Sequence, residues 1–367
     1  MPPRVELGDG HNLDIARRLV ARDDEQKLKQ QSQQSQNDDN IPPQQPRAAA
    51  DKQQATNEAA QSSREEPFVA TIVWRNVILM SALHFGALLG LRQCFVSAQW
   101  KTLACAYLLY VLGGLGITAG AHRLWAHRAY KAKWPLRVIL ACLQSLAFEN
   151  SIYEWSRDHR VHHKYSETHA DPHNAMRGFF FAHVGWLLCR KHPDVKTKGK
   201  QIDLSDLTAD PIVRIQHRYY LPTVALFCFA LPTLIPWLLW SETLYNSFYI
   251  CSLLRYVVTL HATWLVNSAA HMWGRRPYDK NINPSENRGV SFWALGEGFH
   301  NYHHTFPWDY ATSELGYDLN LSKLFIDSFA KLGWAYDRKV VSHEMIKMRK
   351  LRTGDVGELG PYGPHNY

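Results

Sequence analysis

Cysteine is scarce in this sequence and is not arranged as in a redox or zinc-binding motif. The six cysteines are Cys94, Cys105, Cys142, Cys189, Cys228 and Cys251. They form no CxxC pair, and several fall within apolar runs. This spacing excludes a disulfide framework and a zinc ribbon, and it is typical of a chain that faces a reducing cytosol.

Apolar residues are nearly absent from the first part of the chain. Residues 1–66 are rich in Gln, Asn, Asp and Arg, and no apolar segment near Met1 has the form of a signal peptide. Such a composition buries too little apolar surface to offset the entropy lost on ordering. We therefore expect a disordered, glutamine-rich cytosolic tail over 1–66 and a flexible tail over 356–367.

Between the tails, four apolar runs are long enough to cross a bilayer, which needs about 20 residues. They cover 72–91, 103–121, 221–240 and 245–266. A fifth run, 136–148, is too short to span and predicts a buried or interfacial helix. The predicted fold is an all-α integral membrane protein with four transmembrane helices and a helical cytosolic cap.

The distribution of charge indicates the orientation. The net charge is +8, and Lys and Arg are frequent in 122–220, whereas the loops that join the first and second spans and the third and fourth spans are short and hold few basic residues. The positive-inside rule places 122–220, 267–355 and both termini in the cytosol. Apolar runs favour anionic lipid over nucleic acid as the counterpart of this basic charge, so we expect no nucleic-acid partner.

Eight histidines fall in three short motifs. The first is His122-Arg-Leu-Trp-Ala-His127, and the other two, His159-Arg-Val-His162-His163 and His300-Asn-Tyr-His303-His304, share the form HxxHH. On a helix, positions i, i+3 and i+4 lie on one face, so HxxHH directs three imidazoles to one place. The two histidines of the first motif are five residues apart and do not share a face of a regular helix. This spacing is best accommodated at a helix end.

All three motifs follow or lie between spans on one predicted side of the membrane. His271 and Asn267 lie just past the fourth span and add a ninth candidate ligand and a residue able to hold a metal-bound water. So many nitrogens exceed the four ligands of one zinc ion and suit two first-row metal ions. Nearby carboxylates are expected to orient the ligating imidazoles, namely Glu154, Asp158, Glu167, Asp171 and Glu297. The isolated histidines His84, His183 and His261 are expected to be satisfied structural residues.

These motifs resemble those of membrane acyl-CoA desaturases. The resemblance covers residues 116–128, 158–174, 267–271 and 296–304, extends from about Trp74 to Asp355, and is closest to the stearoyl-CoA (Δ9) type and to insect members. It implies a four-span enzyme of the endoplasmic reticulum membrane with two iron ions (Fe²⁺), which uses O₂ and electrons from cytochrome b5 and its NADH-dependent reductase. The implied metal ligands are His122, His127, His159, His162, His163, His271, His300, His303 and His304, with Asn267 acting through water.

The same resemblance implies the residues that bind the fatty acyl-CoA. The head group would contact Asn76, Asn150, Arg157, Asp158, Arg190 and Lys191. Trp155 and Trp264 would line the acyl tunnel, and Tyr110 and Gly114 would close its far end. Two positions depart from the pattern: Glu149 stands where a glutamine is expected, and Gly114 is smaller than usual, which leaves the preferred chain length open.

The resulting hypothesis is a desaturase that inserts a cis Δ9 double bond into saturated C16 or C18 acyl-CoA. A di-iron fatty acyl hydroxylase, or a desaturase acting at another carbon, remains an alternative because the same motifs serve both. A membrane metal transporter or sensor is an alternative of another class. It would require ionisable residues inside the spans, and the spans hold few.

Overall fold

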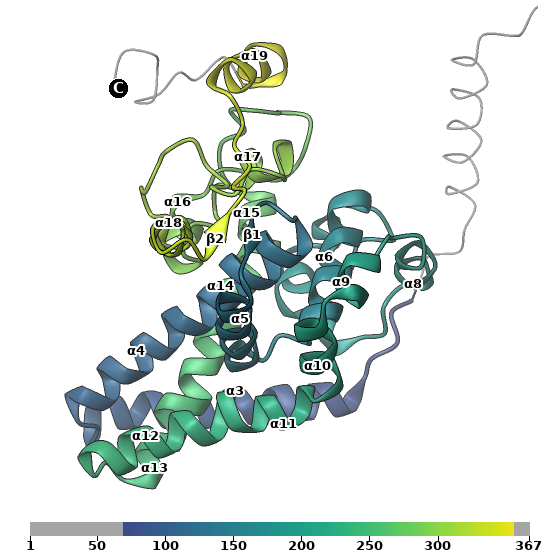
Figure 1. Cartoon of the computed structure of the whole chain (residues 1–367). Helices are drawn as coiled ribbons and strands as arrows, with labels where there is room; N and C mark the ends of the chain where they lie inside the picture. Colours follow the sequence, from purple (N-terminus) through teal and green to yellow (C-terminus); the bar gives the residue numbers. More distant parts are fainter. Residues whose placement is uncertain (1–68, 356–367) are drawn as a thin grey trace, which may run out of the picture. The chain divides into compact units, whose positions relative to one another are not determined.

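The computed structural model describes residues 69–355 and is almost entirely helical (Figure 1). Four of its helices are long and apolar enough to cross a membrane: Trp74–Val96, Trp100–Ala126, Tyr220–Trp240 and Leu244–Met272. The four predicted spans are thus confirmed as helices, and each helix begins or ends beyond the predicted run. The tails predicted over 1–66 and 356–367 lie outside the described residues.

The first span is one regular helix, and the other three change their winding along their length. The spans comprise α3 (Trp74–Val96); α4 (Trp100–Leu115) with the π-helical η1 (Gly116–Ala126); α11 (Tyr220–Val224), η4 (Ala225–Ala230) and α12 (Leu231–Trp240); and α13 (Leu244–Asn246), η5 (Ser247–Leu254), α14 (Arg255–Asn267) and α15 (Ala269–Met272). Pro232 and Pro236 lie in α12. Proline cannot donate a helical hydrogen bond, and such breaks are tolerated where neighbouring helices cover the backbone.

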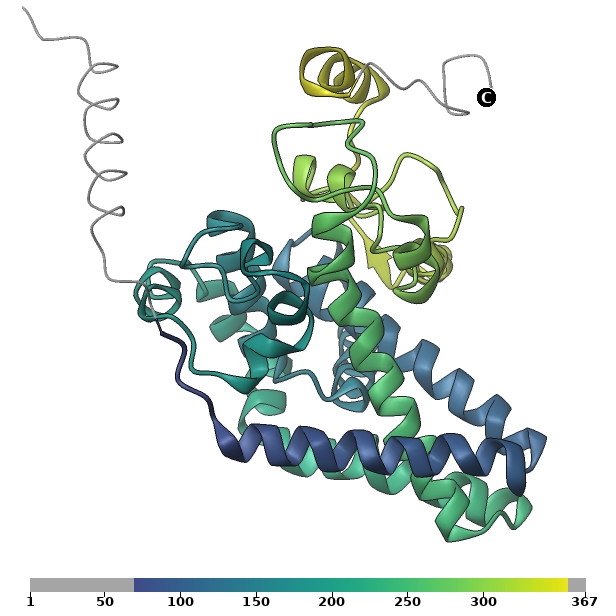
Figure 2. The ribbon, with the colours of Figure 1, turned by 180° about the vertical axis from the view of Figure 1, so that it is seen from behind.

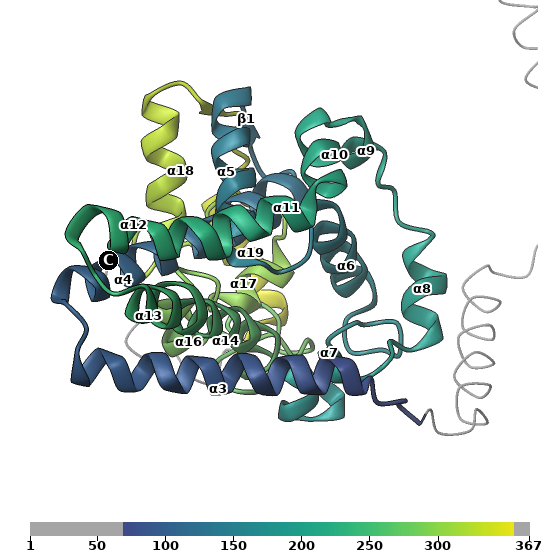
Figure 3. The same cartoon turned by 90° about the horizontal axis from the view of Figure 1, so that it is seen from below.

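The spans pack closely, and α3 lies along η5 (Figures 2 and 3). A Cβ atom at Gly90 would stand 2.2 Å from the carbonyl oxygen of Tyr249, so only glycine permits this approach. The short apolar run forms α5 (Trp134–Ala147), whose Leu136 and Leu140 are fully buried while Trp134 is 71% exposed. One face of α5 is therefore buried, as expected, and the other is exposed.

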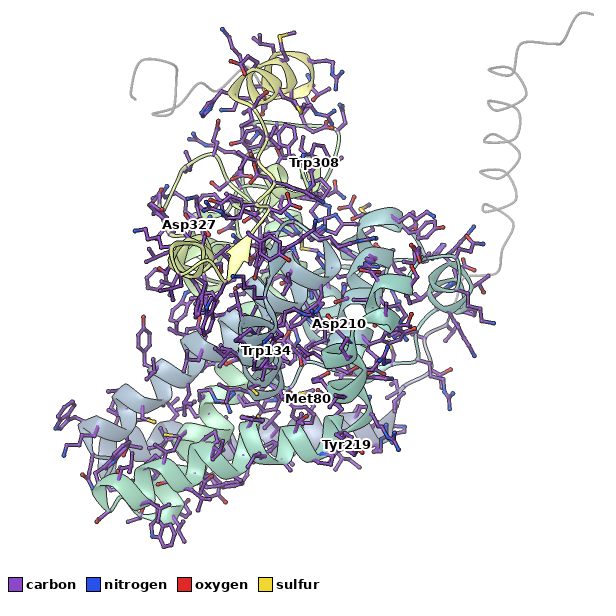
Figure 4. The ribbon with its side chains drawn as sticks, in the orientation of Figure 1. Met80, Trp134, Asp210, Tyr219, Trp308 and Asp327 are labelled. Carbon is purple, nitrogen blue, oxygen red and sulfur yellow. The ribbon has the colours of Figure 1, made fainter. Side chains whose placement is uncertain are left out.

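The remaining elements form the two segments that follow the second and fourth spans. They are β1 (Lys131–Ala132), α6 (Ile152–Tyr165), η2 (Ala175–Arg177), η3 (Phe181–Gly185), α7 (Trp186–Leu188), α8 (Pro193–Gly199), α9 (Ser205–Ala209) and α10 (Pro211–Arg218), then α16 (Arg288–Trp293), α17 (His300–Thr305), α18 (Leu321–Lys331), β2 (Ala335–Tyr336) and α19 (His343–Thr353). β1 and β2 pair antiparallel, with Lys131 opposite Tyr336. Within residues 69–355, α16 to α19 gather at the end away from α12 and α13, and Trp308 and Asp327 mark that end (Figure 4).

One hydrophobic core joins these two segments. Leu140 on α5, Ile152 on α6, Leu207 on α9 and Ile326 on α18 belong to a single buried cluster. α6 begins with a capping box in which the Ser151 hydroxyl accepts from the backbone N–H of Glu154, and the Glu154 carboxylate accepts from the backbone N–H of Ser151. This fixed start sets the register of the three histidines on α6.

Candidate dimetal site

The nine predicted histidine ligands lie together, in two neighbouring groups. The first group contains His122, His127, His159, His163 and His303, and the second contains His162, His271, His300 and His304. Within each group, one ring nitrogen from every histidine lies within 4.8 Å of the others. The histidines come from η1, α6, α15 and α17, which are far apart in the sequence. The three motifs therefore converge, as the topology predicted.

A π-helix solves the spacing of the first motif. η1 has i→i+5 hydrogen bonds, and the N–H of His127 continues this pattern by donating to the carbonyl oxygen of His122 over 3.0 Å. The two imidazoles thereby meet edge to face, with ring centroids 4.9 Å apart and planes 79° from parallel. The expected helix end is present, since η1 ends at Ala126 and His127 is its C-cap. The π-helical winding was not expected, and it brings residues five apart onto one face.

Each HxxHH motif supplies ligands to both groups. On α6, His159 and His163 join the first group, and His162 joins the second. On α17, His300 and His304 join the second group, and His303 joins the first. The i, i+4 pair shares one side of the helix, and the third histidine is turned toward the neighbouring group. One short helix can therefore contribute to two metal ions.

The spacing of the nitrogens fits metal ligation. The Nε2 atoms of His127 and His159 are 2.8 Å apart, and those of His271 and His300 are 3.0 Å apart. Two nitrogens that each lie about 2.1 Å from a shared ion at a right angle would be about 3 Å apart. The residues present therefore fit a pair of first-row metal ions.

Burial keeps most of these imidazoles neutral, as ligation requires. It lowers the pKa of His127, His159 and His163 well below the usual histidine range, with their imidazole neighbours acting in the same direction. The same holds for His300, His303 and His304. Burial would also lower the pKa of His162, but the Asp171 carboxylate outweighs it and raises that pKa.

Three carboxylates orient the histidines from outside. The Nδ1 atom of His122 lies 2.9 Å from Glu297, that of His162 lies 2.9 Å from Asp171, and that of His271 lies 3.2 Å from Glu167. Glu297 is in turn held by the fully buried guanidinium of Arg123. An outer carboxylate fixes the tautomer of an imidazole and makes its other nitrogen a better ligand.

Two other carboxylates were expected in this role, and for them the expectation was wrong. Glu154 closes the capping box of α6. Asp158 is held by Lys191 and Arg157. The reason is their position on α6, where each side chain has a nearer partner than the histidines. Sequence proximity alone could not show this.

Two cavities meet at the histidines. The first, about 50 Å³ and called here the Tyr110 cavity, is lined by Tyr110, Gly114, Trp293 and Leu295 among others. The second, about 230 Å³ and called the Asn150 cavity, is lined by Met80, Glu149, Asn150, Asp158 and Trp264 among others. Four residues line both, namely Trp155, His159, Thr263 and Asn267. The two cavities therefore abut at His159, a member of the first histidine group.

The comparisons with known proteins agree with this arrangement. The model of the family described as "Fatty acid desaturase" matches residues 98–317. The chain belongs to the fatty acid desaturase family. An acyl-CoA Delta-9 desaturase of Acheta domesticus is 62% identical over 291 residues, which cover 79% of this chain and 81% of the relative. An acyl-CoA Delta12-desaturase of the same organism is 61% identical over 79% of this chain and 82% of its own length. Stearoyl-CoA desaturase 5 of Homo sapiens is 59% identical over 77% of this chain and 86% of its own length.

Within this family member, the predicted tunnel residues lie along the two cavities. Trp155 stacks on His159 with ring centroids 4.8 Å apart, and Trp264 lines the Asn150 cavity. Tyr110 donates a hydrogen bond to the carbonyl oxygen of Trp293 and, with Gly114, lines the other cavity. Asn267 ends α14 at the junction, one residue before the helix is interrupted at Ser268.

The predicted head-group residues are brought together only in part. Asn150 and Asp158 line the Asn150 cavity, and Arg157 and Lys191 bind Asp158. Arg190 is exposed on the adjoining surface. Asn76 instead donates to the carbonyl oxygen of Leu187 over 2.8 Å, which ties α3 to α7. Neither Asn76 nor Arg190 is among the residues that line the two cavities.

Sequence reasoning missed Thr263. Its hydroxyl donates to Glu149 over 2.8 Å, and it lines both cavities. The available signal was its position four residues before Asn267, which puts the two side chains on the same face of α14.

The isolated histidines are structural, as expected. His261 forms hydrogen bonds with His84 over 3.1 Å and with His183 over 2.9 Å. His183 also pairs with the Ser268 hydroxyl over 3.0 Å. The row joins α3, α14 and η3 and lies outside both histidine groups.

Proposed function

We propose that the protein is an acyl-CoA desaturase that inserts a cis Δ9 double bond into saturated C16 or C18 acyl-CoA. The observation that carries the proposal is that the two cavities meet at His159, and that histidines of both groups line the Tyr110 cavity. An acyl chain that enters past Asn150 and ends near Tyr110 would pass the metal-binding nitrogens at one fixed depth. That depth selects the pair of methylenes that reacts.

The proposal includes two iron ions, O₂, and electrons from cytochrome b5 and its NADH-dependent reductase. The balanced reaction takes one saturated acyl chain, O₂, two electrons and two protons to one unsaturated chain and two waters. Iron supplies the oxidation of the C–H bonds when it is bound. The chain's own residues hold the imidazoles, exclude water and position the substrate.

The charged residues around the Asn150 cavity support a role in binding the CoA head group. Arg and Lys suit phosphate groups, and Arg157 and Lys191 lie beside Asp158 at this end. We also propose residence in the endoplasmic reticulum membrane, with 122–220, 267–355 and both termini on the cytosolic side. The basic composition of 122–220 supports this orientation.

Expression in a yeast strain that lacks its own Δ9 desaturase tests the function. We expect growth without added unsaturated fatty acid, and products with a cis bond at carbon 9 by mass spectrometry of derivatised lipids. Saturated lipids that stay unchanged, despite bound iron, would refute the proposal. The chain with His300 replaced by alanine is the negative control.

The second candidate is desaturation at another carbon. It is favoured by one observation: a relative named as a Delta12-desaturase is 61% identical, nearly as similar as the Delta-9 relative. A double bond at carbon 12 in the same product analysis would select it. Both relatives are named as acyl-CoA desaturases, so the two candidate functions require the same chemistry at the site.

A further inference from the structure

A partly buried carboxyl group stands beside the junction of the two cavities. Glu149 lies in the turn between α5 and α6, where Phe148 and Asn150 adopt left-handed conformations with φ of 53° and 68°. The Thr263 hydroxyl donates to one carboxyl oxygen over 2.8 Å, and the indole N–H of Trp155 points at the other from 3.4 Å. The side chain thus turns inward from the helix end.

Both of these donors line both cavities, and Glu149 itself lines the Asn150 cavity. An acyl chain that passes from one cavity to the other must pass this carboxyl group. We propose that Glu149 has to carry a proton when the acyl chain is bound. Above neutral pH, binding of the acyl chain therefore takes up one proton at this residue. The inference rests on the proposed function, since it assumes an acyl-CoA as the occupant.

The physical reason is the cost of leaving an anion beside methylene groups. Water in the Asn150 cavity can solvate a carboxylate, and an acyl chain displaces that water. Trp155 lies against both Glu149 and His159, because its indole N–H points at the carboxyl group while its ring stacks on that imidazole. The carboxyl group is therefore set against the tunnel wall and not among the ligands.

The surrounding hydrogen bonds allow the protonated form without loss. The Thr263 hydroxyl lies 3.3 Å from the carbonyl oxygen of Thr259 and can donate there instead. The oxygen of Thr263 is then free to accept from the carboxylic O–H, and Trp155 continues to donate to the other oxygen. Every polar atom keeps a partner in both protonation states.

Burial raises the pKa of Glu149 to about 8, against the opposing effect of the bonds from Thr263 and Trp155. The titratable groups around it are Tyr220 on α11, Tyr256 on α14, Glu154 and Asp158 on α6, His159 and His173. The carboxyl group is therefore mostly protonated at pH 7 and ionises as the pH rises through about 8. Below that range binding should be independent of this residue. Above it, binding should weaken by at most about tenfold per pH unit, the limit for one proton.

The test measures binding of stearoyl-CoA to the metal-loaded full chain, without an electron donor so that no turnover occurs. Affinity is determined by calorimetry at pH 7, 8 and 9, with free CoA as the control for titration of the head group. We expect the dissociation constant of stearoyl-CoA to rise several-fold more than that of free CoA from pH 7 to pH 9. In Glu149→Gln, the dissociation constants of stearoyl-CoA and free CoA should change in parallel with pH.

The matched control is Glu154→Gln, which removes a nearby carboxylate and keeps the capping box, because glutamine also serves at that position. It should retain the wild-type pH dependence. Glu149→Gln with an undiminished pH dependence would overturn the proposal. So would equal pH dependence for stearoyl-CoA and free CoA in the wild type.

A second measurement needs no variant. Calorimetry of the wild type at pH 9 in two buffers of different ionisation enthalpy reports the protons taken up per acyl chain bound. We expect up to one proton more for stearoyl-CoA than for free CoA, and no difference would refute the inference. Product analysis on the same preparation, with electrons supplied, separates the two proposals. A missing double bond would contradict the proposed function, but it would not change the number of protons measured on binding.

Discussion

His163 and His304 stack face to face, with ring centroids 4.1 Å apart and planes 16° from parallel, although they belong to different histidine groups. His163 lies on α6 and His304 on α17. Their contact marks the edge that the two groups share. The two ions that these groups would hold must therefore be neighbours, which suits a reaction that needs both at one substrate.

Removing a histidine from one group should lower the metal content, whereas removing a histidine outside both groups should not. We expect about two metal ions per wild-type chain, and His304→Ala should bring the content toward one, because the second group then keeps three imidazoles. The measurement is elemental analysis of purified protein. His343→Ala, at the exposed start of α19, is the control and should keep the full content. A His304→Ala protein with undiminished metal would contradict the assignment of the two groups.

The Asp171 carboxylate should strengthen metal binding without touching the ion. It binds His162 over 2.9 Å and accepts from the backbone N–H groups of Glu167 and His173. Burial raises the pKa of Asp171, but its partners, His162 foremost, hold it far below the usual range, so the group is an anion. Asp171→Asn should weaken metal affinity about tenfold to a hundredfold.

Competition with a chelator measures that affinity. Asp194→Asn should leave it unchanged, because Asp194 on α8 pairs with His192, which belongs to neither histidine group. If Asp171→Asn binds metal as tightly as the wild type, the carboxylate serves the loop between α6 and η2 and not the metal centre.

Gly114 should set the length of the Tyr110 cavity. A Cβ atom there would stand 2.7 Å from the Cδ1 atom of Leu295, which lines the same cavity. Gly114→Ala therefore narrows the far end, and we expect a shift from stearoyl-CoA toward palmitoyl-CoA when the two compete.

The matched control for this change is Gly86→Ala. Its Cβ atom would meet the Cδ1 atom of Leu253 at 2.6 Å, a similar clash between two spans, but Gly86 lines neither cavity. It should lower stability without altering the ratio of C16 to C18 products. Equal ratios for both variants would show that the cavity end does not select chain length.

Lys191 should contribute to binding of the CoA phosphates. It pairs with Asp158, as does Arg157, at the mouth of the Asn150 cavity. Lys191→Ala should weaken binding of free CoA by up to about tenfold at low salt, roughly 1.4 kcal/mol, and less at high salt because the charges are screened. Lys200→Ala, which removes an exposed lysine at the end of α8, should have a smaller effect. Equal losses for the two variants would indicate a general effect of net charge.

Several features were accessible from the sequence because they depend on neighbouring residues. Apolar length predicted four spans, and the i, i+3, i+4 spacing predicted that the histidines of 159–163 and 300–304 converge. The unusual spacing of His122 and His127 was visible, but the π-helix that accommodates it was not. That winding depends on how η1 packs against α5 and α6.

By itself, the sequence determined that this is a four-span membrane protein with a histidine-rich metal centre. Both properties follow from local composition and from the periodicity of a helix. Only the tertiary structure decided which histidine joins which group, that Glu167, Asp171 and Glu297 and not Glu154 or Asp158 support them, and that Glu149 lies where the two cavities meet. These include contacts between residues far apart in the sequence, such as His122 and His303, which are 181 positions apart, and only the packing of the helices brings such pairs together.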